Sequence, residues 1–249
     1  SKPAEFRDEI FTWEAPFNAA PKSFYKLKQR YAGVQWTNGD YAVVSENWYD
    51  TRNLKSFLVN LKTGESRELE NRNFQDVYSD PGKLSETKNK FGEMVADVAG
   101  GKAYLIGDGF TKDGQHPFID EVDLNTLQKK RLYTSKLSSA KEDIIDIIDI
   151  SKGTVLTRQQ SPSIYPNYLL KNIKSNKISS VTAFTNPFES IGNIYKEVIK
   201  YKRNDGVELT GTLYLPAGYN RKNPAEKLPL LIWAYPAEYK DKNTAGQNT

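Results

Sequence analysis

The sequence contains no cysteine and one histidine, His116. Without cysteine there is no disulfide bridge, no thiolate nucleophile and no thiolate metal site, and the redox compartment stays undetermined. A single histidine excludes zinc sites that need two or three imidazoles. Residues 107–109 begin like a dinucleotide fingerprint, but Lys112 stands where that motif needs its third glycine. The sequence therefore predicts no metal site and no cofactor.

Long hydrophobic runs are also missing. The longest uncharged apolar stretch, residues 228–237, is about half the ~18 residues that a membrane-spanning helix needs. The first ten residues have no apolar core of the kind found in signal peptides, so we expect a mature end or a cut within a longer protein. No membrane span is predicted.

Apolar residues make up 38% of the 249 residues, against about 45 to 50% in average globular domains. The core is therefore thin, although 12% aromatic residues partly compensate because each buried ring removes much apolar area from water. The net charge of +4, with 27% charged residues, is typical of neither a disordered polyelectrolyte nor a dedicated nucleic-acid binder. We expect no nucleic-acid partner.

Short alternating or β-branched runs, separated by turn residues, recur along the first three quarters of the chain and predict strands. They fall into three units of similar internal order: 40–46, 55–62 and 66–70; then 102–107, 117–124 and 129–134; then 144–150, 154–159, 168–173 and 177–183. A spacing of about 45 to 60 residues matches the four-stranded blades of a β-propeller. The alternative is a β-sandwich, which also has many short strands.

One run fits two patterns. Ile144, Ile147 and Ile148 have the spacing of one helix face. Crowding of β-branched side chains in a helix and the following turn at 151–153 favour a strand.

The pattern changes after residue 187. Residues 197–203 and 208–216, joined through Asp205-Gly206, predict a hairpin with a type I′ turn. The run 228–235 has no polar alternation, as expected of a strand buried on both faces in the parallel sheet of an α/β domain. We place a boundary near 191–194, so that residues 1–193 form part of a propeller and residues 194–249 the first strands of an α/β domain.

Two of these segments carry a family resemblance. NDGVELTGTLYLPAGY (204–219) and LPLLIWAYPAEYKDKNTAGQ (228–247) resemble the opening of the α/β-hydrolase domain in the prolyl oligopeptidase family of serine peptidases. The similarity is greatest to the glutamyl endopeptidase-like branch of bacteria and chloroplasts. It extends upstream through the motifs ENWYDTR (46–52), DVYSDPG (76–82), IGDGFTKDGQHPFIDEVDL (106–124) and LTRQQSPSIYPNY (156–168).

The resemblance implies a propeller that caps a hydrolase domain, with the active site in the cavity between them. The implied activity is peptide-bond hydrolysis, with cleavage after Glu in this branch. The implied partners are a peptide substrate and the remainder of the hydrolase domain. Bacterial members tend to be exported, which implies a periplasmic or secreted protein.

The family chemistry needs a serine in a G-x-S-x-G elbow, followed by an Asp and a His. No such pentapeptide occurs, and the nearest site, residues 64–68, lacks the second glycine. His116 precedes the hydrolase segment and cannot be the triad histidine in chain order. We therefore expect the triad to lie beyond Thr249, and this chain alone to be inactive.

Tyr235 is the candidate catalytic residue. The resemblance implies that its hydroxyl donates to the oxyanion of the tetrahedral intermediate, a contribution of about 3 to 4 kcal/mol for one donor. The alternative from the residues alone is a tyrosine that caps a buried strand.

Arg52 and Arg158 are candidate substrate-binding residues, because recognition of a glutamyl side chain needs a buried cation with a two-pronged geometry. The alternative for both is ion pairing on the surface or between blades. The segment 71–91 is long and polar enough to be a functional loop.

The alternative function is a free-standing β-propeller that serves as a binding module, with the final strands closing its ring. A partial ring would instead expose strand edges and apolar faces, and we then expect self-association.

Overall fold

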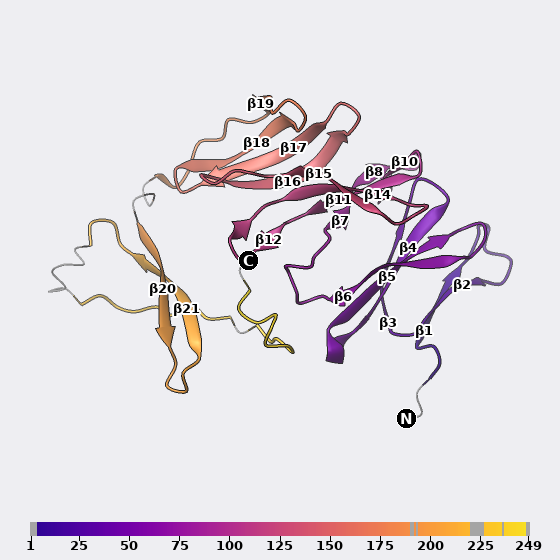
Figure 1. The fold of residues 1–249 in the computed structure, drawn as a ribbon, viewed down its shortest axis with the longest axis horizontal. Coiled ribbons are helices and arrows are strands. Elements are labelled where there is room, and N and C mark those ends of the chain that lie inside the picture. The colour runs from indigo at the N-terminus through magenta and orange to yellow at the C-terminus, as the bar shows by residue number, and fades with distance from the viewer. Residues whose placement is uncertain (1–3, 190–191, 193, 220–226, 236, 248–249) are drawn as a thin grey trace.

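The computed structural model describes residues 4–189, 192, 194–219, 227–235 and 237–247. These residues form antiparallel strands and one short 3-10 turn, η1 (Tyr49–Thr51). Figure 1 shows three sheets that stand next to one another like the blades of a fan. The predicted fold class, a partial β-propeller rather than a sandwich, is confirmed.

The three blades are antiparallel sheets; blades 1 and 3 consist of consecutive strands, whereas the β12–β13 hairpin interrupts blade 2. Blade 1 contains β3 (Arg30–Trp36), β4 (Tyr41–Trp48), β5 (Asn53–Asn60) and β6 (Ser66–Asn73). Blade 2 contains β10 (Val98–Ala99), β11 (Lys102–Gly107), β14 (Phe118–Asp123) and β15 (Lys129–Thr134), with β7 (Lys83–Leu84) also paired to β11. Blade 3 contains β16 (Lys141–Asp149), β17 (Thr154–Ser161), β18 (Ile164–Asn172) and β19 (Ile178–Ser180).

Four hairpins accompany the blades, each a two-stranded sheet. They are β1 (Asp8–Thr12) with β2 (Lys22–Leu27), β8 (Glu86–Lys88) with β9 (Met94–Ala96), β12 (Phe110–Thr111) with β13 (Gly114–Gln115), and β20 (Tyr195–Lys202) with β21 (Glu208–Leu215).

The blades stack because their central strands are apolar on both faces. On β4, Val43 faces blade 2 and packs with Leu105, whereas the next residue, Val44, faces the β1–β2 hairpin and packs with Leu27. Successive side chains of a strand point to opposite faces, so two adjacent valines place one residue in each of two cores. Burial of each such side chain stabilises the fold by about 1.5 to 3 kcal/mol.

A third core joins blades 2 and 3, around Ile119, Ile144 and Val155. The run that begins at Ile144 is strand, as predicted, and β16 shifts its register between Ile144 and Asp146 and again between Ile147 and Asp149. A bulge resets the inward and outward alternation. This is why Ile144 and Ile147 both pack in the same core despite their odd spacing.

The hairpin after the blades has the predicted strands but another turn. Gly206 has φ +87°, and Asn204 and Asp205 are not among the residues with positive φ, although a type I′ turn needs positive φ at both central positions. Arg203 O accepts a hydrogen bond of 2.8 Å from Gly206 N, and Arg203 N donates one of 2.9 Å to Val207 O. The connection is therefore a tight turn followed by a left-handed glycine, and the type I′ prediction is wrong.

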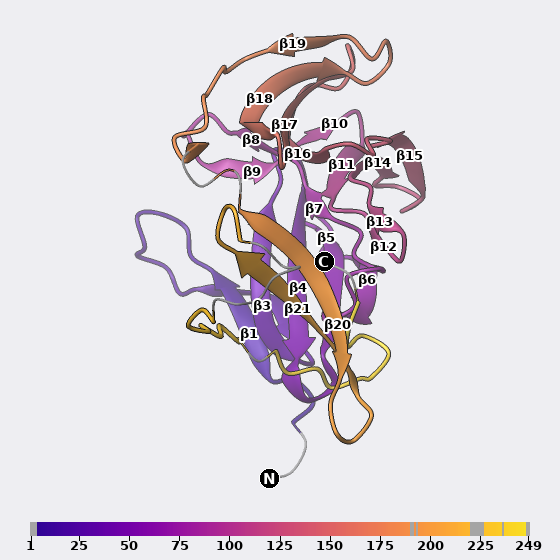
Figure 2. The same cartoon turned by 90° about the vertical axis from the view of Figure 1, so that its left-hand side faces the viewer.

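This β20–β21 hairpin forms a sheet of its own and joins none of the blades in the described part of the chain. Figure 2 shows it crossing in front of blade 1. Within the described residues, the final strands therefore do not close a propeller ring, as the alternative would require. The predicted boundary near 191–194 falls between β19 and β20, on a stretch where 190, 191 and 193 lie outside the described residues.

The predicted buried strand at 228–235 is wrong in this structure. None of these residues is in a strand, and Leu231 and Trp233 are 89% and 86% exposed. A strand that is apolar throughout needs neighbouring strands at its edges and covering layers on its faces. No described strand pairs with it here.

In the part of the chain that the structure describes, no helix is long and apolar enough to cross a membrane.

Candidate functional site

Residues 237–247, here called the docked segment, lie against one end of blade 1. Figure 1 shows the segment in yellow between the β20–β21 hairpin and blade 1. Its contacts are with two parts of the blade: Arg52, which follows η1 between β4 and β5, and residues 75–77, which follow β6. The contacts thus bring residues 52, 75–77 and 238–247 into one polar cluster.

Arg52 is the buried centre of this cluster, with 2% of its surface exposed. It ends η1 in the left-handed conformation, φ +56° and ψ +22°, which disfavours side chains larger than glycine. Its guanidinium lies 3.7 Å from the ring centroid of Tyr49, and both its backbone N and its Nη1 donate to Tyr49 O. Backbone strain of this kind is concentrated at functional sites.

The carboxylate partner of Arg52 is Glu238. Arg52 Nη2 donates a 3.0 Å hydrogen bond to Glu238 Oε1, across 186 positions of the sequence. Glu238 approaches from the solvent side, because its side chain is 70% exposed while that of Arg52 is 2% exposed. Arg52 Nε is buried and has no hydrogen-bond partner in the described structure.

Gln75 holds the backbone on both sides of Tyr239, the residue after this glutamate. Its Nε2 donates to Glu238 O, and its Oε1 accepts a 3.0 Å hydrogen bond from Lys240 N. One side-chain amide therefore pairs with the docked segment as a neighbouring strand would.

Asp76 and Gln247 make a second anchor, in which Gln247 Nε2 donates a 2.7 Å hydrogen bond to Asp76 Oδ1. Burial raises the pKa of Asp76, but hydrogen bonds from Gln247, Ser79 and the backbone of Tyr78 outweigh it and hold the pKa below its ordinary value. The carboxylate is therefore ionised at neutral pH.

Tyr235 lies just before the docked segment and is 88% exposed. It does not cap a buried strand here, because residues 228–235 are not in a strand. Three positions separate it from Glu238, which limits the backbone between them to about 11 Å. Its role as an oxyanion donor stays a prediction.

Arg158 is placed apart from this cluster, on β17 of blade 3. Its Nε and Nη2 both donate to Asp143 Oδ2, at 3.3 and 2.8 Å, and the two residues are opposite each other on β16 and β17. The hydrogen bond to Asp143 raises the pKa of Arg158. Nε and Nη2, the two donors along one edge of the guanidinium, are thus both used by an ion pair within one blade. Binding of a substrate by Arg158 stays a prediction.

His116 follows β13, between the β12–β13 hairpin and β14 of blade 2, and its Nδ1 lies 3.3 Å from Ser135 O. Within the described residues, the polar cluster of the docked segment contains no histidine.

The prediction of a loop at 71–91 is only partly right, because β6 continues to Asn73 and β7 and β8 lie within the range. The part that remains a loop supplies Gln75 and Asp76 to the cluster.

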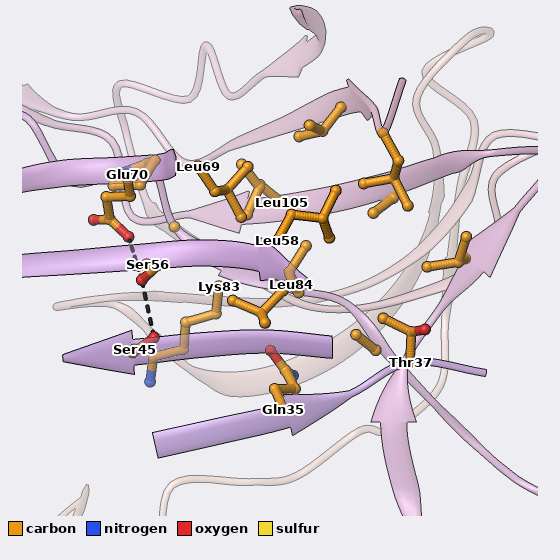
Figure 3. Close-up of a pocket in the computed structure, with 18 of the residues that line it drawn as sticks. Gln35, Thr37, Ser45, Ser56, Leu58, Leu69, Glu70, Lys83, Leu84 and Leu105 are labelled. Atoms are coloured by element: carbon orange, nitrogen blue, oxygen red, sulfur yellow. Dashed lines mark hydrogen bonds between the residues drawn. The ribbon is translucent and has the colours of Figure 1, made fainter. Parts of the chain in front are cut away.

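A separate cavity of about 310 Å³ opens between blades 1 and 2. Figure 3 shows its apolar side, with Leu58 and Leu105, and its polar side, where Ser45 Oγ lies 2.9 Å from Ser56 Oγ. Ser56 Oγ is 3.5 Å from Glu70 Oε2, and no histidine lines the cavity. A serine beside a carboxylate without an imidazole lacks the general base of a Ser-His-Asp triad.

The polar cluster contains residues that the sequence reasoning did not single out, namely Gln75, Asp76, Glu238 and Gln247. The sequence pointed to their segments but not to the individual residues. Glu238 and Gln247 lie in the segment 228–247 that carries the family resemblance, and Gln75 and Asp76 lie in the polar segment 71–91. The class of protein is thus a partial β-propeller whose first blade holds a segment from a following region of the chain.

Comparison with known proteins identifies relatives for nearly the whole chain. The chain is 34% identical over 258 residues to a probable chloroplastic glutamyl endopeptidase of Oryza sativa subsp. japonica, covering 97% of this chain and 27% of that protein. It is 33% identical over 243 residues to the protein of the same description from Arabidopsis thaliana, covering 91% and 25%. No protein-family model matches the chain.

Among solved structures, oligopeptidase B from Leishmania major aligns with 87% of this chain and 36% of that chain, at 6% identity and a TM-score of 0.49.

The chain belongs to the prolyl oligopeptidase family, as the motifs at 204–219 and 228–247 led us to expect. It spans about a quarter of the length of the two plant relatives. The descriptions of both relatives place them in the chloroplast, so they give no support to the predicted periplasmic or secreted location.

Proposed function

We propose that this chain supplies the last propeller blades and the first hydrolase strands of a serine peptidase that cleaves peptides after glutamate. Residues 1–193 would cap the active site, and residues 194–249 would begin the catalytic domain. The catalytic serine, aspartate and histidine would come from sequence outside this chain.

The observation that carries the proposal is the contact between Arg52 and Glu238. It brings the end of blade 1 next to the segment that follows Tyr235. A cationic group of blade 1 and the candidate oxyanion donor thus belong to one region, although they are far apart in the sequence. A glutamyl peptidase needs both: a cation for the glutamyl side chain and a donor for the oxyanion.

Arg52 fits the role of the specificity cation better than Arg158. Arg158 already uses Nε and Nη2 on Asp143. Arg52 uses Nη2 on Glu238 but leaves Nε without a partner. A glutamyl carboxylate would pair with both donors of such an edge.

The chain alone is proposed to be inactive, because it has no G-x-S-x-G pentapeptide and its one histidine precedes the hydrolase segment. A fluorophosphonate probe should therefore label the full-length protein and leave this 249-residue chain unlabelled. Stoichiometric labelling of a serine within the chain would contradict the assignment of the nucleophile.

Substrate preference tests the activity itself. The full-length protein should hydrolyse a peptide with Glu at the cleavage position and cleave the matched Gln peptide much more slowly, because only the carboxylate forms an ion pair with Arg52 and offers two acceptor oxygens to its donors. Prior treatment with the fluorophosphonate should abolish both rates. Equal rates for the Glu and Gln peptides would refute the glutamyl specificity, and absence of hydrolysis would refute the peptidase proposal.

A further inference from the structure

We infer that Glu238 is a displaceable internal ligand of Arg52: it occupies the carboxylate site that a glutamyl side chain takes when a peptide binds. The inference rests on the proposed function, since it takes the ligand to be the glutamyl side chain of a peptide. It adds a competitor within the chain that regulates access to the site.

The pairing of the buried Arg52 cation is incomplete. Arg52 is 2% exposed, and in the described part of the chain its ion pair is with Glu238. Nε–H and one Nη2–H point in the same direction along the side edge of a guanidinium and can hold both oxygens of one carboxylate. Glu238 uses Nη2 at 3.0 Å and leaves the buried Nε without an acceptor. A ligand carboxylate aligned with this edge would satisfy both donors.

The guanidinium of Arg52 is otherwise fixed in its position. Nη1 donates to Tyr49 O, and one face of the guanidinium packs on the Tyr49 ring at 3.7 Å. The left-handed backbone at Arg52 is tied to the same residue through a 3.2 Å hydrogen bond from its N to Tyr49 O. The side edge therefore keeps its direction when its partner changes, as a preorganised binding group must.

The side chain of Glu238 can leave Arg52 without release of the docked segment. Its side chain is 70% exposed and reaches Arg52 from solvent, so its departure opens the same route to a ligand. The backbone stays held, because Gln75 bonds to Glu238 O and Lys240 N, and Gln247 bonds to Asp76 and to Val77 N. Only the rotamer of one side chain has to change.

The chemistry of the ligand follows from that of the competitor. Glu238 contacts Arg52 through a carboxylate at the end of a two-methylene side chain. A glutamyl side chain has the same length and charge, whereas a glutaminyl side chain lacks the charge and has only one carbonyl oxygen as acceptor. The site should therefore select glutamate over glutamine, and removal of the charge at position 238 should favour the external ligand.

The experiment measures binding rather than hydrolysis. N-acetyl-glutamic acid α-amide is titrated into the full-length protein by calorimetry, for the unmodified protein and for Glu238→Gln, with N-acetyl-glutaminamide as the uncharged probe. Removal of the competitor should tighten binding of the charged probe by about tenfold, which corresponds to about 1.4 kcal/mol. Binding of the uncharged probe should change less than twofold.

Glu93→Gln is the matched control, since Glu93 is an exposed glutamate outside the cluster, and it should leave both affinities unchanged. Arg52→Lys should lose the preference for the charged probe, because an ammonium cannot offer the two-pronged edge. The conclusion depends on Glu238→Gln alone, so a misfolded Arg52→Lys does not affect it. Circular dichroism of Glu238→Gln verifies that the fold is retained.

If Glu238→Gln leaves the affinity for the charged probe within twofold, or changes both probes equally, Glu238 is a fixed structural partner and the inference is overturned. This result can be told from a failure of the proposed function. Tighter binding of the charged probe by Glu238→Gln without any hydrolysis would support the carboxylate site and refute the peptidase proposal. Hydrolysis with unchanged probe binding would support the peptidase proposal and overturn the inference about Glu238.

Discussion

Gln247 and Asp76 form a hydrogen bond of 2.7 Å across 171 positions of the sequence. The same glutamine accepts a 2.9 Å hydrogen bond from Val77 N through its Oε1. A single side-chain amide thus ties the docked segment to the loop that follows β6. Thr244, which lies within the docked segment, is also buried, with 5% of its surface exposed.

Gln247→Ala should loosen the docked segment without unfolding the blades. The variant removes both bonds to the loop after β6, while the core contacts of blade 1 are unchanged. Hydrogen exchange followed by mass spectrometry should show faster exchange over residues 237–247 and unchanged exchange over β4 and β5. Unchanged exchange in the segment would mean that Gln247 does not anchor it.

Blades 1 and 2 are joined by Arg67, whose guanidinium donates to Leu124 O and Asn125 O. Arg67→Ala should lower the free energy of unfolding by about 1.5 to 3 kcal/mol, the usual contribution of hydrogen bonds to charged groups. Urea denaturation measures this free energy of unfolding. Arg30→Ala is the matched control, because Arg30 pairs with Asp8 at 3.0 Å but its side chain is 62% exposed. Its loss of stability should be about 0 to 1 kcal/mol. Equal losses would contradict the assigned role of Arg67.

Blades 2 and 3 are joined by a buried group of Glu142, Lys171 and Tyr133, in which Lys171 Nζ donates to Glu142 Oε1 at 2.8 Å and Tyr133 OH donates to Glu142 Oε2 at 2.6 Å. Burial raises the pKa of Glu142, but hydrogen bonds from Lys171, Ser135 and Tyr133 outweigh it and hold the pKa below its ordinary value of 4.5. A carboxyl with a lowered pKa in the folded state stabilises the fold above its unfolded pKa and loses that contribution as the pH falls.

The melting temperature should therefore fall as the pH decreases below 4.5, and Glu142→Gln should show a flatter pH dependence in that range. At pH 7 this variant should be less stable by about 3 to 5 kcal/mol, because Lys171 is left buried without its carboxylate. Calorimetry between pH 7 and pH 3 measures both effects. Parallel pH profiles for the two proteins would show that Glu142 does not carry the acid sensitivity.

The 249-residue chain should self-associate when it is prepared alone. Ile148 of β16 is 54% exposed, and Leu231 and Trp233 are 89% and 86% exposed. Contiguous exposed apolar side chains and unpaired strand edges promote association. Light scattering should give a mass that rises with concentration, and a monomer at high concentration would contradict this expectation.

Much of the fold could be predicted because the central blade strands are short, apolar and bounded by turns. β4, β5, β11 and β14 all match predicted runs. β3 was missed because its register shifts between Tyr31 and Gly33, which breaks the alternation that identifies a strand. β1 and β2 were also missed.

The site could be predicted only in part. Arg52 was a candidate because its residue type suits a carboxylate, but local patterns do not reveal that its partner is Glu238, 186 positions away. The sequence suggested the same chemistry for Arg158, but Arg158 is more exposed than Arg52 and has Asp143 opposite it on β16. Contacts between distant segments depend on how the blades and the docked segment pack together, and no periodicity encodes them.

The proposed function assigns the region around Arg52, Tyr235 and Glu238 to a peptidase active site. Steady-state kinetics of Tyr235→Phe in the full-length protein, normalised by active-site titration, test it most directly. We predict that kcat and kcat/KM fall together by about 10² to 10³, with substrate affinity nearly unchanged, because the lost hydroxyl donates only once the oxyanion forms. An unchanged kcat in the correctly folded variant would contradict the account.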